Sequence, residues 1–403
     1  MVDGRSDVPL PDRLSRIRDL RVNWGNLIWE GYKDLPLDIS EYRSHDFAAG
    51  VLAILAGKSL KGCGRTLEYE SPEIPFGDFS IDPTQDLLVF LQNDARGQVH
   101  LRTLSTNESH PGAQEHVLNF LISSDPDSVV RIRKAFLHIA SNVLALFIVH
   151  WHNARRLLIW DWHNGALIYD SGEDFGPNIQ YFSLLNRSSF VLTSNLDSVL
   201  AACLHLPPIK SPKYVYRLSV DSGMIQAEPA EGSLFFTSPD SHILAFSITY
   251  ADFDIPHDSG HSYELFVHNH TLLKYIQNYS AALDGNATEA ESRPLSVHWD
   301  EWGEHNTRLL PCPEPMFWSR YPDNYLPFID VLDFNMARVS MSDVDAQTEH
   351  HLCTEPSKLL LDVFESPLAM FYHSYIIDEE RLIAVDVDSH NHHYIKGLQI
   401  NWF

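Results

Sequence analysis

Four twelve-residue segments of the chain share one pattern, and this repetition is the strongest constraint on the fold. Each segment begins with an aromatic residue, has polar turn-forming residues in its middle and ends in an apolar run, which predicts two strands joined by a tight turn. The segments are FSIDPTQDLLVF from Phe79, FLHIASNVLALF from Phe136, FSLLNRSSFVLT from Phe182 and FFTSPDSHILAF from Phe235.

The starts of these segments lie 57, 46 and 53 residues apart. A hairpin that recurs about every 45–55 residues is typical of the blades of a β-propeller. Further hairpins are expected from Tyr263 to Ile276 and from Phe371 to Val385. The chain from residue 76 to residue 403 has room for roughly six or seven such blades. We therefore predict an all-β, WD-like β-propeller of six or seven blades, preceded by a short N-terminal helical segment.

The second repeat contains the clearest blade motif, in the string RRLLIWDWHNGALIYDSG from Arg155 to Gly172. An apolar run ends in Trp160 and Asp161, and Asn164 and Gly165 follow as turn residues. The Asn-Gly pair predicts a type I′ hairpin turn. A Trp-Asp pair at a strand end is typical of WD-type blades, in which we expect the indole to pack between blades and the carboxylate to bind nearby amides.

The N-terminal region has a different pattern. Apolar residues recur with the period of a helix, and Asp12 is a candidate helix cap. We expect this helix to lie against the following domain with its arginines in water; a membrane-surface or calmodulin-type helix is the alternative. The apolar segment from Phe47 to Ala56 fits either a strand or a short helix. These patterns predict a helical lead over residues 1–60 and a propeller domain over residues 61–403.

The charge of the chain limits its partners. There are 29 Lys and Arg residues against 54 Asp and Glu, for a formal net charge of −25. Nucleic acids and anionic membranes need a basic surface, so we expect neither as a partner. The chain lacks a recognisable export signal and a long apolar span, and its four cysteines form no CxxC pair, which predicts reduced thiols. We predict an intracellular protein of the cytoplasm, the nucleus or both.

Enzyme motifs are missing from the sequence. It contains no GxSxG elbow, no GxxxxGK[ST] or GxGxxG phosphate loop and no SxDxGxTW box. Histidines gather at His150 and His152, at His350 and His351, and at residues 390–393, but surface or core positions explain them better than a metal site. We expect no enzymatic activity, no cofactor and no metal. The alternative is a propeller hydrolase, glycosidase-like, that uses carboxylates on the propeller rim.

A proline-rich and aromatic stretch between residues 308 and 327 is a candidate binding rim. Aromatic side chains on a proline-stiffened loop are typical of a contact surface, although they can equally plug the face of the propeller itself. The candidate rim residues are Phe317, Trp318, Tyr321 and Tyr325.

Several strings, taken in order, resemble a large family of F-box proteins from mushroom-forming fungi. They are the helix from Arg13 to Trp29 and the strings VHWDEWGEHNTR, VLDFNMARV and YIIDEERLIAV. The most specific positions are Trp299, Trp302 and Arg308. In that family an N-terminal F-box precedes a WD-like propeller.

The resemblance implies a non-catalytic role. An F-box docks on the Skp-type adaptor of a cullin ubiquitin ligase, and the propeller presents a target protein. The F-box itself is not visible in this chain, since twelve residues precede the Arg13 helix, so adaptor and cullin are expected partners only with an F-box upstream. Trp299, Trp302 and Arg308 then have two possible roles, closure of the propeller or binding of a partner.

Overall fold

The structure is a computed structural model of the 403-residue chain. It describes residues 2–3, 7–26, 28–39, 42–49, 51–56, 59–63, 68–69, 76–92, 97–122, 132–150, 154–172, 178–194, 198–200, 204–206, 213–221, 235–236, 242–252, 261–284, 297–311, 330–333, 362–365, 374–377, 381–387 and 395–402.

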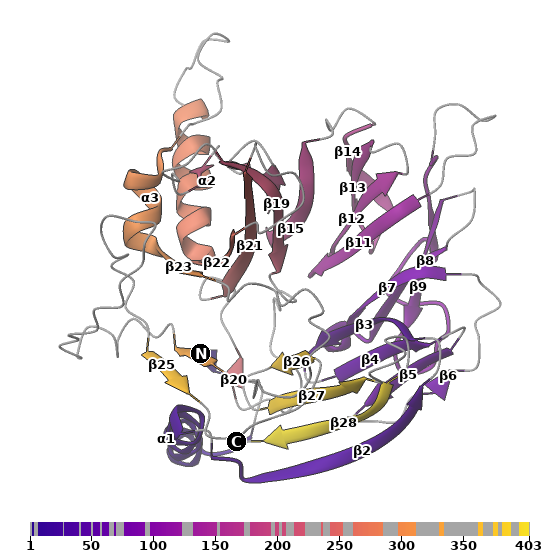
Figure 1. Cartoon of the computed structure of the whole chain (residues 1–403). Coiled ribbons are helices and arrows are strands. Elements are labelled where there is room, and N and C mark those ends of the chain that lie inside the picture. The colour runs from indigo at the N-terminus through magenta and orange to yellow at the C-terminus, as the bar shows by residue number, and fades with distance from the viewer. Residues whose placement is uncertain are drawn as a thin grey trace.

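Antiparallel four-stranded sheets follow one another in chain order around the molecule (Figure 1). The first two sheets contain β3 (Tyr42–Ala48), β4 (Val51–Ala56), β5 (Ser59–Cys63) and β6 (Glu68–Tyr69), then β7 (Phe76–Asp82), β8 (Leu87–Gln92), β9 (Gln98–Thr103) and β10 (Val117–Asn119). The next two contain β11 (Ile132–Ala140), β12 (Val143–His150), β13 (Arg155–Asp161) and β14 (Ala166–Asp170), then β15 (Ile179–Asn186), β16 (Ser189–Ser194), β17 (Ser198–Leu200) and β18 (Leu204–His205).

Two more four-stranded sheets and two short pairs follow among the described residues. The fifth and last sheets have the orders β19-β21-β22-β23 and β2-β28-β27-β26. Their strands are β19 (Lys213–Asp221), β21 (Ile243–Asp252), β22 (His261–His268) and β23 (Thr307–Pro311), then β2 (Gly31–Ile39), β26 (Ser374–Ile377), β27 (Arg381–Val387) and β28 (Ile395–Trp402). The short pairs join β24 (Asp330–Asp333) to β25 (Asp362–Glu365), and β1 (Val2–Asp3) to β20 (Phe235–Phe236).

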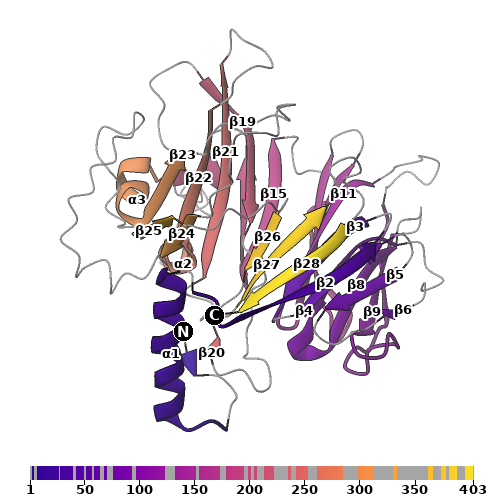
Figure 2. The same cartoon turned by 60° about the horizontal axis from the view of Figure 1, so that its bottom comes forward.

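The two ends of the chain meet in the last sheet. Strand β2 pairs with β28, so that Leu35 lies opposite Leu398, and β2 forms the outer edge of that sheet (Figure 2). An edge position tolerates Pro36 within the strand, because the outer side of an edge strand needs no backbone donor. In the first five sheets the first strand is the innermost, and these strands contact their counterparts in neighbouring sheets. The chain folds as a β-propeller.

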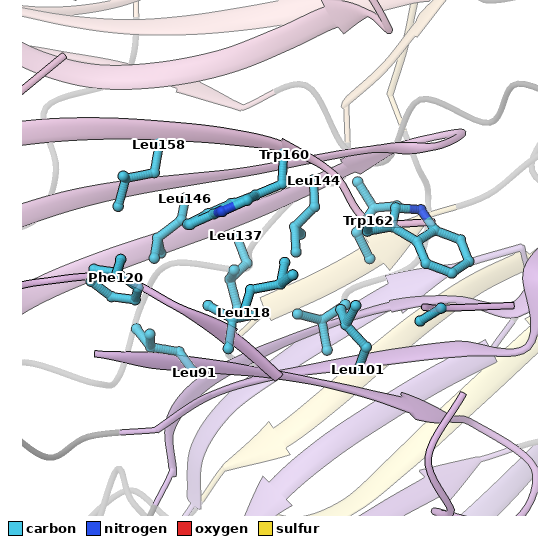
Figure 3. Packing of buried hydrophobic residues seen from close by; sticks show 14 of the residues in the cluster. Leu91, Leu101, Leu118, Phe120, Leu137, Leu144, Leu146, Leu158, Trp160 and Trp162 are labelled. Atoms are coloured by element: carbon cyan, nitrogen blue, oxygen red, sulfur yellow. The ribbon is translucent and has the colours of Figure 1, made fainter. Parts of the chain in front are cut away.

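The hydrophobic core is divided among the spaces between neighbouring sheets. Strand β12 shows why, since every one of its residues is buried. Leu144, Leu146 and Ile148 pack toward the second sheet, whereas Ala145 and Phe147 pack toward the fourth. Side chains of a strand alternate between the two faces of a sheet, so a continuous apolar run is needed where both faces are covered. Figure 3 shows the cluster between the second and third sheets.

Three of the four predicted hairpins are confirmed, namely β7–β8, β11–β12 and β15–β16. The fourth is wrong: Phe235 and Phe236 form β20, which pairs with β1, whereas β21 pairs with β19 and β22. The predicted hairpin between β26 and β27 is also confirmed. The ambiguous segment from Phe47 to Ala56 belongs to the hairpin of β3 and β4, which turns at Ala49 with a φ of 46°.

A second predicted hairpin, from Tyr263 to Ile276, is half helix. Strand β22 ends at His268 and helix α2 (Asn269–Asp284) begins at the next residue. Leu272 and Leu273 are buried and Ile276 packs beside them, a spacing that follows a helix instead of a strand. Helix α3 (Trp299–Asn306) then leads into β23, so that both helices are inserted between two strands of the fifth sheet.

The N-terminal helix α1 spans Leu10–Asn26 and starts before the expected cap Asp12, which lies in its first turn. The main-chain carbonyl of Pro9 accepts hydrogen bonds from the amides of Asp12 and Arg13. Pro11 is tolerated here because the first helical turn needs no intrahelical donor. After α1 the chain enters β2, so strands of the propeller sheets already begin at Gly31 and not at residue 61.

Candidate functional site

The Trp-Asp motif lies at the end of β13, as predicted. Trp160 is buried in the cluster between the second and third sheets (Figure 3). One carboxylate oxygen of Asp161 accepts the main-chain amide of His163 at 3.0 Å. The other accepts the side-chain amides of Asn142 at 3.1 Å and Asn164 at 3.2 Å. The carboxylate therefore joins the β11–β12 turn to the β13–β14 turn.

The β13–β14 turn differs from the predicted two-residue type I′ turn. Asp161 pairs with Ala166, which leaves a four-residue loop between them, and only Gly165 has a positive φ, of 73°. A Cβ atom at Gly165 would also lie 2.7 Å from Cγ of Glu115. Asn164 instead accepts the amide of Ala166 with its side-chain oxygen. The loop is longer because Trp162 turns inward.

Trp162 is a residue that the sequence reasoning missed. Its side chain is buried, and its indole Nε1 donates to the main-chain oxygen of Ser141. The ring of His110 stands edge-on to this indole at a centroid distance of 5.0 Å. Nδ1 of His110 accepts the Gly112 amide and Nε2 lies 3.0 Å from the carbonyl oxygen of Gln85. The second tryptophan of the string WDW was the signal in the sequence from which Trp162 could have been identified.

The tryptophans of the family-like motif lie in the protein interior. Trp299 and Trp302 belong to α3 and pack into the core of the fifth sheet, with their rings 5.4 Å apart and nearly perpendicular. Gly303 lies directly beneath the indole of Trp299, and a Cβ atom there would come within 2.1 Å of the ring. The carbonyl of Gly303 accepts the hydroxyl of Thr307 at 2.7 Å. This arrangement fixes the junction between α3 and β23.

Arg308, the third residue of the motif, lies in β23 opposite Phe266 of β22. It is half-buried, and burial lowers the pKa of its guanidinium group. The motif is thus brought together on one helix–strand junction of the fifth sheet.

The other candidate residues are not covered by the structure. The rim aromatics Phe317, Trp318, Tyr321 and Tyr325 lie outside the described residues, as do the histidine groups at residues 350–351 and 390–393. Within the described ranges no three His, Cys, Asp or Glu side chains gather in a way that could hold a metal ion. No helix in those ranges is both long and apolar enough to cross a membrane.

Two carboxylates on the innermost strands β3 and β7 are the most unusual titratable groups. Asp46 accepts the hydroxyl of Ser80 and the amide of Ile81, each at 2.8 Å, and the amide of Phe47 at 2.9 Å. Asp46 therefore links the first sheet to the second. Burial raises its pKa above the ordinary value, against the opposing effect of these hydrogen bonds.

Asp78, the second of these carboxylates, accepts the amide of Phe79 at 2.9 Å. Burial raises its pKa to about 7, and the nearby charge of Asp46 adds to this effect. A carboxyl group with such a pKa can donate or accept a proton near neutral pH. Sequence reasoning named neither Asp46 nor Asp78, because chain position alone does not reveal which of many acidic residues face an inter-sheet contact.

Two surfaces of the described structure expose apolar side chains in series. On α1, Leu20 is buried, whereas Leu10, Leu14 and Val22 face solvent. On β14 all five residues are exposed, although the neighbouring strand β13 is mostly buried. Exposed apolar side chains that gather in one place are typical of surfaces that bind other proteins.

Comparisons with known proteins assign the chain to no family. No protein-family model matches the chain, and none of the curated proteins matches it significantly. The WD40 domain of SCAP from fission yeast is 10% identical, with 93% of this chain and 98% of that chain covered and a TM-score of 0.39. The WD40 domain of Toxoplasma gondii coronin is 8% identical, with 92% of this chain and 86% of that chain covered and a TM-score of 0.40.

The WD40 β-propeller domain of Doa1 is 12% identical over 60% of this chain and 71% of that chain, with a TM-score of 0.31. The assignment of a propeller here rests on the strand order and sheet contacts of the chain itself.

Proposed function

We propose that the protein is a non-catalytic interaction propeller that acts in the cytoplasm or nucleus as the substrate-receptor part of an F-box, cullin-type ubiquitin ligase. The observation that supports this role is the solvent-exposed apolar face of α1, formed by Leu10, Leu14 and Val22. This helix corresponds to the segment that follows the F-box in the fungal proteins that the chain resembles.

The α1 face has the properties of a helix-docking surface. Leu10 and Leu14 are one helical turn apart, so their side chains are neighbours on the helix surface. Burial of an exposed leucine or valine against a partner is worth roughly 1 kcal/mol or more. The side chains of Arg16 and Asn23 both bind a carboxylate oxygen of Glu30, which ties the helix to the segment that follows it. A helical adaptor or F-box module could pack on this face.

A glycosidase-like hydrolase is the second candidate, and the raised pKa of Asp78 favours it. The acid of such an enzyme needs a pKa near the working pH, together with a second carboxylate for the nucleophile or base. Asp46 is the neighbouring carboxylate, but its oxygens already accept three hydrogen bonds, two of which join the first sheet to the second. Hydrolysis of chromogenic glycosides that is abolished by Asp78→Asn would establish this alternative.

The ligase role is tested with the gene product as its own cells make it. The gene would be tagged at its chromosomal locus, and the protein would be purified by affinity and analysed by mass spectrometry. With an F-box encoded upstream of α1, we expect a Skp-type adaptor and a cullin among the recovered proteins, in amounts comparable to the tagged chain. Recovery of other partners without adaptor and cullin would reject the ligase role.

A further inference from the structure

We propose that the outer edge of the third sheet is a docking ridge that inserts into an apolar, basic-rimmed groove of a partner protein. The ridge consists of Leu167, Ile168 and Tyr169 of β14 together with Leu121, which follows β10 of the second sheet, and we call it the β14 ridge. This inference rests on the proposed role in protein interaction and specifies the surface and the kind of partner.

Exposure distinguishes the β14 ridge from the rest of its sheet. The exposed fractions of its four side chains are 74% for Leu121, 49% for Leu167, 59% for Ile168 and 43% for Tyr169. In contrast, Leu157 and Leu158 on the adjacent strand β13 are fully buried. The exposure of four large apolar side chains to water in one region is unfavourable, and their burial against a partner would remove this cost.

The register shows that the surface is a ridge and not a flat face. Leu167 lies opposite Trp160, and Tyr169 lies opposite Ile159. Trp160 and Ile159 are consecutive in β13, so their side chains point to opposite faces of the sheet. Leu167 and Tyr169 therefore cover the two faces of the edge, a shape that fits into a groove.

A β-bulge in β14 limits the ways in which a partner can bind to this edge. The register shifts between Ile159 and Trp160, so that Ile168 is an extra residue with no paired residue in β13. A bulge interrupts the row of backbone donors and acceptors on an edge strand and disfavours the addition of another strand. It also adds a third consecutive apolar side chain. Recognition by side chains is therefore favoured over strand pairing.

The β14 ridge is held in shape by one arginine. Nε of Arg156 donates to Oδ1 of Asp170 at 2.8 Å, and a terminal nitrogen of the same guanidinium binds the other carboxylate oxygen. The remaining terminal nitrogen donates to the main-chain oxygen of Leu121. The hydrogen bonds from Arg156 hold the pKa of Asp170 below its ordinary value. A surface fixed before binding loses less conformational entropy when a partner arrives.

Charge indicates the chemistry of the partner. Glu115 is exposed and packs against Gly165, just before β14, whereas the charge of Asp170 at the end of the strand is balanced by Arg156. The whole chain carries a formal charge of −25. A second copy would bring two acidic surfaces together, which costs free energy, whereas Lys and Arg around a groove would be attracted. A partner of opposite charge is therefore favoured over self-association.

The test uses the full chain in its own cells with a photo-crosslinking amino acid in place of Leu167 or Tyr169. A matched control carries the same amino acid in place of Tyr32, which is exposed on the distant strand β2. We expect one discrete adduct from both ridge positions and none from the control, with the crosslinked site of the partner in an apolar groove bordered by Lys or Arg.

The partner identified in this way would then be purified and titrated with the chain. We expect Leu167→Asp and Tyr169→Asp to weaken binding at least tenfold, and Tyr32→Asp to leave it unchanged. Equal thermal unfolding midpoints of the three variants would exclude misfolding, and Leu167→Ser offers a milder replacement if the charged variant is unstable. An adduct with a second copy, no adduct above the control, or unchanged affinity of the ridge variants would overturn the proposal.

The two proposals fail separately. Recovery of adaptor and cullin with chains whose ridge positions give no adduct would reject the β14 ridge and keep the ligase role. A ridge partner recovered without adaptor or cullin would reject the ligase role and keep the β14 ridge.

Discussion

The indole Nε1 of Trp162 donates a 2.9 Å hydrogen bond to the main-chain oxygen of Ser141. The same oxygen accepts the side-chain amide of Gln85 at 3.0 Å. Trp162 follows β13 in the third sheet, whereas Gln85 lies in the 3₁₀ turn η1 (Pro83–Gln85) of the second. One carbonyl group thus joins two blades, and Asp82 steadies the arrangement by accepting the other hydrogen bond of the Gln85 amide.

The shared carbonyl predicts non-additive effects. Removal of one donor, by Trp162→Phe or Gln85→Ala, leaves Ser141 with the other, so we expect each variant to lower the free energy of unfolding by about 1–2 kcal/mol. The double variant leaves the carbonyl without either donor and should cost more than the sum. Urea denaturation of the four proteins measures this coupling. Strict additivity would contradict the shared role of the carbonyl.

Trp299 offers a test of packing against hydrogen bonding. Among the described residues its buried Nε1 has no acceptor, so Trp299→Phe removes an unsatisfied donor and keeps an aromatic ring. We expect Trp299→Phe to change the free energy of unfolding by less than about 1 kcal/mol, and Trp299→Ala to cost about 3–5 kcal/mol. Thermal and urea denaturation would compare them. Equal losses for both variants would mean that the indole nitrogen is needed.

Gly303 should be intolerant of substitution although it lies within a helix. Alanine normally stabilises a helix relative to glycine by about 1 kcal/mol. Here a Cβ atom would overlap the ring of Trp299, so we expect Gly303→Ala to be destabilising. Ser15→Ala, at an exposed position of α1, is the control for a substitution without such an overlap. A gain in stability for Gly303→Ala would show that Trp299 can move aside freely.

Asp78 predicts the direction in which stability depends on pH. Its pKa is about 7 in the folded protein against 3.8 for the ordinary group, so the folded state holds the proton over a pH range in which the unfolded state has lost it. The contribution of Asp78 to the free energy of unfolding should therefore be largest below about pH 4. It should fall by up to about 1.4 kcal/mol per pH unit as the pH rises from about 4 to about 7.

The substitution Asp78→Asn should flatten this dependence and make the protein more stable than the wild type at pH 8. Asp19→Asn, at an exposed position of α1, is the matched control. Denaturant titrations at a series of pH values provide the measurement. An unchanged slope between pH 4 and pH 7 in Asp78→Asn would mean that the carboxyl group is ionised throughout.

Local patterns predicted the repeating hairpins because each one is built from consecutive residues. The pairing of β2 with β28 joins residues 31–39 to residues 395–402 and has no local signature. The helix α2 was missed because the first half of the predicted hairpin is a real strand, and the change from strand to helical spacing comes only after His268. Phe235 and Phe236 have the pattern of a strand, but that pattern does not reveal which strand they pair with.

The proposed functional surfaces were harder to predict than the fold. The sequence of β14 reads as an ordinary apolar strand, and its exposure follows from its edge position and its bulge. Trp299 and Trp302 were recognised from a resemblance that left two roles open, and the structure adds that both indoles lie in the core. Asp46 and Asp78 are 32 residues apart and become neighbours only when the first two sheets pack together.

The most direct test of the proposed ligase role is the ratio of cullin to tagged chain in affinity purifications from the native cells. Wild type would be compared with Leu14→Glu, which places a charge in the exposed apolar face of α1, and with Ser15→Glu, which adds the same charge at an exposed neighbour. We expect comparable amounts of cullin and chain for wild type and Ser15→Glu, and at least a tenfold lower ratio for Leu14→Glu. Absence of cullin from the wild-type purification would contradict the account.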